Sequence, residues 1–183
     1  MTNKIFTVLI VLTFLSNNNI FSQEIDSTTK SNLQTYTPSK LLSKGQWDIK
    51  WFNNLYTEMN YANSNGKSLS KLRENYFTST IEGFTGISDN NRFNIGLILE
   101  YRSNTNGGRQ ALSVFSLTDD PNSARKGVTS FAPTVKFQPF STVSNFSIQT
   151  ALHIPLVKNE AENGVYLDQT AWTLQNRFFY DYS

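Results

Sequence analysis

Apolar and polar residues alternate along most of the chain after residue 45. In the stretch from Arg92 to Arg102 the odd positions are large and apolar, and the even positions are mostly polar or small. A period of two residues predicts a β-strand with one apolar face. The pattern recurs, so we expect about six strands in total. They cover residues 46–61, 72–87, 92–102, 128–138, 145–157 and 171–182.

The alternation does not by itself say whether the apolar face meets a protein core or lipid, because a soluble sandwich also buries one face. Three features favour lipid. The polar connections alternate between long and short, as in outer-membrane barrels. The strands are long enough to cross a bilayer at a tilt. Aromatic residues recur near strand ends on the apolar face, at Trp47, Tyr61, Phe93, Tyr101, Phe131, Phe146, Trp172 and Tyr182.

The predicted fold class is therefore all-β, an antiparallel up-and-down transmembrane β-barrel with about six strands present. Single-chain barrels of this kind begin at eight strands, so six leave the barrel incomplete. We expect the chain to be the N-terminal portion of a longer barrel or to close by oligomerisation through its edge strands.

The N-terminal residues have the layout of a secretory signal peptide. Lys4 precedes an apolar run from Ile5 to Leu15, and a polar segment with the small residue Ser22 follows. The run is too short to span a bilayer. We expect a cleaved signal peptide at 1–22, a flexible lead-in at 23–44 and the barrel at 45–183, with export to the outer membrane.

Composition excludes several kinds of chemistry and partner. The chain has no cysteine, which excludes disulfides, a thiol nucleophile and a lipid-modified N-terminal cysteine. A formal charge of +2 gives no electrostatic footprint for nucleic acid. The expected partners are outer-membrane lipid, the barrel-assembly machinery and a small molecule whose identity is unknown.

The face opposite the aromatics carries charges of both signs, which predicts a mixed-charge lumen. The candidate lining residues are Asp48, Lys50, Glu58, Glu100, Arg102, Lys136, Gln149, His153, Arg177 and Asp181. Such residues either pair with one another or line a small pore. Ile98 lies among them and indicates at least one layer of packed side chains in the lumen.

The sequence offers little catalytic chemistry. His153 is the only histidine. It could serve a lipase-like serine on a neighbouring strand, but a polar lining residue is the favoured interpretation. Carboxylates occur at no metal-ligand spacing, and Asp119–Asn122 is typical of a turn rather than a calcium loop. We expect no enzyme activity, no metal and no cofactor.

Two prolines interrupt the predicted strands. Pro133 and Pro155 cannot donate to a ladder hydrogen bond. Both are therefore expected near one rim of the barrel, at the outer end of their strands.

Three segments resemble a family of uncharacterised outer-membrane barrel proteins from Bacteroidetes-type bacteria. They are GQWDIKWFNNLYTE at 45–58, ENYFTSTIEGFTGISDNNRFNIGLILEYRS at 74–103, and PTVKFQPF with NFSIQTALHIPL within 133–156. The resemblance implies a barrel in the outer membrane and carries over no catalytic or ligand residue. The favoured function is passive or substrate-specific transport. The alternatives are a soluble exported β-barrel or sandwich that binds an apolar ligand and, with least support, an outer-membrane lipase.

Overall fold

The computed structural model describes residues 38–116 and 120–182. The expected signal peptide at 1–22 and most of the expected lead-in lie outside these residues. Where the structure describes the chain, no helix is long and apolar enough to cross a membrane. The architecture is all-β, as predicted. Its elements are β1 (Trp47–Ala62), β2 (Ser68–Gly86), β3 (Phe93–Thr105), the 3-10 helix η1 (Ala111–Phe115), β4 (Ala124–Phe137), β5 (Phe146–Pro155), β6 (Ala161–Glu162), β7 (Val165–Tyr166) and β8 (Thr173–Tyr180).

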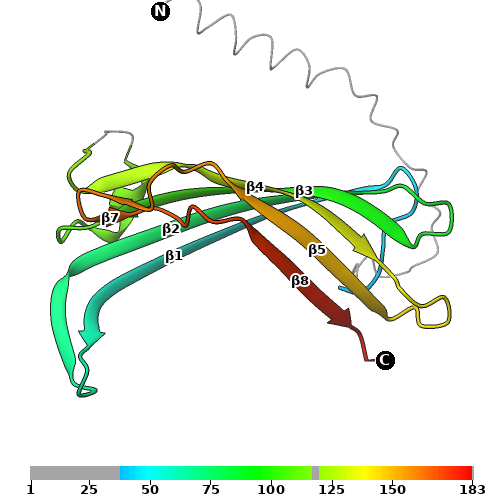
Figure 1. Ribbon diagram of the computed structural model, residues 1–183, viewed down its shortest axis with the longest axis horizontal. Helices are drawn as coiled ribbons and strands as arrows, with labels where there is room; N and C mark the ends of the chain where they lie inside the picture. Colours follow the sequence, from blue (N-terminus) through cyan, green and yellow to red (C-terminus); the bar gives the residue numbers. More distant parts are fainter. Residues whose placement is uncertain (1–37, 117–119, 183) are drawn as a thin grey trace, which may run out of the picture. The chain divides into compact units, whose positions relative to one another are not determined.

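Six strands form one antiparallel sheet in the order β1-β2-β3-β4-β5-β8. Figure 1 shows this sheet curling from β1 at one edge to β8 at the other. Each strand pairs with the next long strand in the sequence, which is the up-and-down connectivity that the alternation predicted. The sheet is thus a curled half-barrel.

The two faces of the sheet differ sharply in burial and polarity. On one face the large apolar side chains are exposed, from Trp51 of β1 at 70% to Phe178 of β8 at 67%. On the other face Ile98, Ala132 and Ala151 are almost fully buried and contact one another, as the position of Ile98 predicted. Side chains converge on the inside of a curled sheet and diverge on its outside. We therefore name these the outer face and the inner face.

Two segments cover opposite ends of the inner face. At one end lies the strap, which we define as residues 38–46; it contains the buried Leu41. At the other end, the β6–β7 hairpin is held by Asn104 of β3, whose Nδ2 donates to the carbonyls of Tyr166 and Leu167. The sequence analysis placed residues 38–44 in a flexible lead-in, whereas in the structure they contact the sheet.

Gly86 allows the strap to lie against the end of β2. The Gly45 amide donates to the carbonyl of Gly86, and the Gly86 amide donates to the carbonyl of Gln46. A Cβ at position 86 would overlap the carbonyl oxygen of Ser43. Only glycine therefore permits this approach.

The prolines behave differently from each other. Pro155 is the last residue of β5, so the prediction of a rim position is confirmed there. For Pro133 it is wrong, because this residue pairs with Leu97 inside β4 and lies nearer the opposite end of the strand. The pairing of β4 with β5 omits Ala132 and Pro133, so the missing donor falls at a local break in the ladder.

The described part of the connection that follows β3, residues 106–116, folds over the end of the outer face. Phe115 of η1 stacks edge-on against Phe77, with ring centroids 4.7 Å apart. The Ser103 hydroxyl donates to the carbonyl of Val114 at 2.6 Å. This end of the outer face is therefore covered by the chain itself.

Candidate functional site

The ten predicted lining residues lie on the inner face. Strand register shows this directly, since Asp48 is opposite Phe84, and Lys136 is opposite both Asn94 and Gln149. The structure does not gather the ten residues into one cluster. It divides them among four groups along the inner face.

The first group lies beneath the strap and holds it. The Lys136 ammonium donates to the carbonyl of Pro38 and lies 4.7 Å from the centroid of the Phe179 ring. The strap amide of Ser39 donates to Asp181 Oδ2 at 2.8 Å. Predicted lining residues here therefore serve mainly to anchor a segment of the chain. Asp48 and Lys50 form an ion pair on β1, and Gln149 is buried beside Lys136 on β5.

The second group is an ion pair across the curl of the sheet. Arg177 Nη1 of β8 donates to Glu82 Oε1 of β2 at 2.8 Å. The Glu82 side chain is only 7% exposed, whereas that of Arg177 is 38% exposed. β2 and β8 are not neighbours in the sheet, so the pair ties opposite parts of the curl together. The sequence analysis missed Glu82, although its position next to Ile81 in an alternating strand was a usable signal.

The third group involves Glu58 near the β1–β2 turn. Lys71 lies between two carboxylates, 3.0 Å from Glu58 Oε2 and 2.8 Å from Glu74 Oε2. The Glu74 carboxylate also accepts a hydrogen bond from the Tyr76 hydroxyl at 2.6 Å. The charged side chains of this group therefore pair with one another.

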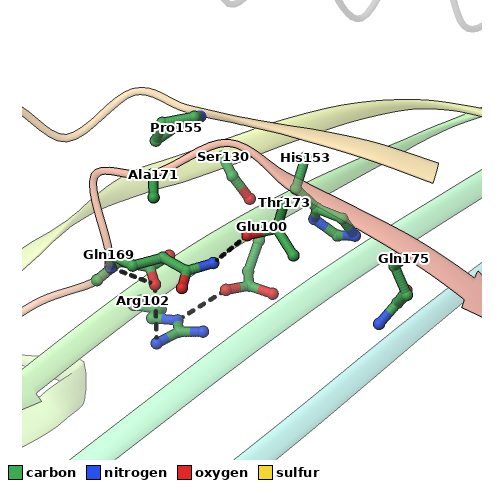
Figure 2. A pocket seen from close by; sticks show the side chains of 10 residues that line it. Glu100, Arg102, Ser130, His153, Pro155, Gln169, Ala171, Thr173 and Gln175 are labelled. Carbon is green, nitrogen blue, oxygen red and sulfur yellow. Dashed lines mark hydrogen bonds and ion pairs between the residues drawn. The ribbon is translucent and has the colours of Figure 1, made fainter.

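The fourth group lines a cavity of about 160 Å³ beside the β6–β7 hairpin. Figure 2 shows the Glu100–Arg102 pair facing Ser130 and His153 across it. Arg102 Nε lies 2.7 Å from Glu100 Oε1, and its Nη1 lies 3.2 Å from Asp168 Oδ1. Asp168 follows the hairpin, and its surrounding sequence has no periodicity that could have revealed it.

Several buried polar atoms of the inner face lack a hydrogen-bond partner among the described residues. They are Asn104 Oδ1, Ser147 Oγ, Gln149 Nε2, His153 Nε2 and Gln175 Oε1. In folded proteins almost all such atoms are satisfied by protein, water or ligand. Each of these atoms is also closed to solvent, so the inner face buries polar groups that its own side chains leave unpaired.

The hairpin beside the cavity carries a perturbed tyrosine. Burial raises the pKa of Tyr166, and the nearby Asp168 carboxylate raises it further, because both disfavour the phenolate. Tyr166 also supplies one of the carbonyls that Asn104 holds.

The described residues include no group of three or more His, Cys, Asp or Glu side chains placed to hold a metal ion. Comparison of the chain with protein-family models, with curated proteins and with solved structures finds no match.

Proposed function

We propose that the chain forms part of an outer-membrane β-barrel, with its outer face against acyl chains and its inner face lining a polar lumen used for transport of small solutes. The observation that carries this proposal is the apolar outer face, whose large side chains are exposed on β1, β2, β3 and β8 and half-buried on β5. Its members include Trp47, Ile49, Trp51, Leu55, Ile81, Ile95, Leu97, Leu99, Leu174, Phe178 and Tyr180.

Energetics argue against leaving that face in water. Burying one large apolar side chain contributes roughly 1.5–3 kcal/mol, and the outer face leaves about half of each such side chain uncovered. Exposed apolar patches of this extent mark interaction or membrane surfaces. Lipid covers a face of this shape without requiring a complementary partner.

Strand dimensions agree with a membrane placement. A strand tilted at about 45° needs roughly 9–11 residues to cross a bilayer. β1 has 16 residues, β3 has 13 and β5 has 10. β8 has 8, and the exposed Tyr182 continues its outer face beyond the paired residues.

Placement in lipid has a consequence for the sheet edges. Unpaired backbone groups are not tolerated in hydrocarbon, so β1 and β8 would each need a further strand. Five successive antiparallel pairings make β1 and β8 run in opposite directions. Additional strands, whether from a second copy or from further chain, can therefore continue the same antiparallel order.

The soluble alternative, a module that binds an apolar ligand inside the barrel, fits less well. The inner face carries mostly charged and amide side chains, and its buried apolar cluster is small and already packed; Phe52 and Tyr56 are exposed on it only at the β1 edge. An apolar ligand would find its best surface on the outer face.

Fractionation of cells that express the full chain tests the proposal. We expect the protein in the outer-membrane fraction, resistant to carbonate extraction, with faster gel mobility before heating than after. Release with the periplasmic fraction in the absence of detergent would contradict a membrane placement. A double variant that places lysine at Leu97 and Leu99 serves as a control, because it should impair membrane assembly and not synthesis.

A further inference from the structure

The cavity at the hairpin end of the inner face has the features of a small-molecule site. Its walls come from β3, β4, β5, β8 and the segment after the β6–β7 hairpin, so its shape depends on the curl of the sheet. At about 160 Å³ it has room for roughly five water molecules, taking about 30 Å³ for each. A solute of a few non-hydrogen atoms would fill it.

The charge of the cavity selects for cations. Two carboxylates, Glu100 and Asp168, face a single guanidinium, that of Arg102. Their side chains are only 16% and 7% exposed, so water screens them weakly. The two carboxylates and the guanidinium together carry one net negative charge. Both carboxylates would repel an anion, whereas a cation would compensate the excess negative charge.

The hydrogen-bonding groups select for a donor. Arg102 is already engaged by both carboxylates, and the amide of Gln169 donates to Asp168 Oδ1 at 2.8 Å. Gln175 Oε1 and His153 Nε2 also lack a partner among the described residues, but both atoms are closed to solvent. The acceptors that a ligand in the cavity meets are the carboxylates of Glu100 and Asp168, and an ammonium group has three donors and no acceptor.

We propose that this cavity binds a small protonated amine, with the ammonium group against the carboxylates of Glu100 and Asp168. The proposal depends only on the inner face and holds whether or not the outer face meets lipid. Within a barrel, the cavity would be a selective binding site for small organic cations along the lumen.

His153 provides a built-in reporter, because it is the only histidine in the chain and lines the cavity. The experiment uses the untagged full chain in maltoside micelles, which carry no ammonium headgroup. Ethanolammonium chloride is titrated at neutral pH while the imidazole resonances of His153 are recorded. We expect a saturable shift with ethanolammonium and none with ethylene glycol or sodium glycolate at the same concentration.

Three variants at single positions sharpen the test. E100Q should weaken ethanolammonium binding roughly tenfold or more, because it removes a charged acceptor and releases Arg102 into the site. Q175E should tighten binding by adding a third carboxylate. E58Q removes the same charge from the inner face outside the cavity and should leave the affinity unchanged.

The proposal is overturned if no saturable shift occurs, if ethylene glycol or glycolate shifts the resonances as strongly, or if E58Q weakens binding as much as E100Q does. If E100Q fails to fold, as judged by loss of its β-sheet circular dichroism in the same micelles, Q175E decides the outcome. Tighter binding in Q175E supports the site, and unchanged or weaker binding contradicts it.

Discussion

An arginine substitution on the outer face should destabilise the protein more the deeper it lies in the membrane. Leu97 and Ile87 make a matched pair, because each exposes 44% of its surface on the same face. Leu97 is central among the outer apolar positions of β3. Ile87 donates its amide to the carbonyl of Phe93 and so lies level with the start of that strand.

The expected difference follows from the spacing of the two positions. Leu97 lies four residues from Phe93, which is about 14 Å along a strand. At a tilt of about 45° this becomes about 10 Å of depth in a hydrocarbon layer whose half-thickness is about 15 Å. Arginine on the lipid face costs about 2–4 kcal/mol at the midplane and about 0–1 kcal/mol near the interface. We expect Leu97→Arg to lower the free energy of unfolding by about 2–3 kcal/mol more than Ile87→Arg does.

The assay is equilibrium urea unfolding from phosphatidylcholine vesicles, followed by tryptophan fluorescence. All three tryptophans suit this readout, since Trp47, Trp51 and Trp172 are each about 70% exposed. If the outer face met water, each substitution would change the free energy of unfolding by no more than about 0.5 kcal/mol, as is usual at a protein surface. Equal and small effects at the two positions would therefore refute the membrane placement.

Three further substitutions test contacts of the inner face. Gly86→Ala should displace the strap and destabilise the fold by about 1–3 kcal/mol, measured by hydrogen exchange of residues 38–46, while Gly83→Ala, whose added Cβ has open space, should not. Arg177→Ala should cost about 1–3 kcal/mol in urea unfolding by leaving the buried Glu82 unpaired, and converting both partners to glutamine should recover most of the loss. The pKa of Tyr166 is raised in the folded state, so its neutral form adds to the free energy of unfolding. This stabilisation is complete below pH 10 and is lost as the pH rises through the pKa of Tyr166 in the folded protein. Tyr166→Phe should therefore reduce alkaline loosening of the hairpin, and an unchanged exchange profile above pH 10 would contradict this.

The strands and most of their faces could be predicted from the sequence because side-chain direction in a strand has a strict period of two. The strand at 72–87 is the exception, because Tyr76 and Phe84 lie on the face opposite Phe77 and Ile81. The ends of the strands could not be predicted. β2 begins at Ser68 and not at residue 72, and β4 begins at Ala124 and not at residue 128. These end residues include a single large apolar side chain, Leu69, which is too few to show a period of two, so backbone pairing places them in the sheet.

The candidate site could be predicted only in part. Glu100, Arg102 and His153 share a face by parity, which the sequence shows. Asp168 reaches them from a loop whose course depends on the fit of the hairpin against Asn104, and no periodicity encodes that. The anchoring role of Lys136 likewise depends on the strap, a segment with no pattern of its own.

The most direct test of the central claim is the environment of successive side chains along β3. The chain has no cysteine, so a nitroxide label can be placed at one position at a time from residue 93 to residue 102. In vesicles, collision rates with oxygen report hydrocarbon, and those with a water-soluble nickel complex report water. We expect high oxygen and low nickel accessibility at positions 95, 97 and 99, with oxygen accessibility falling at the even positions between them. Nickel accessibility that exceeds oxygen accessibility at 95, 97 and 99 would contradict the membrane placement.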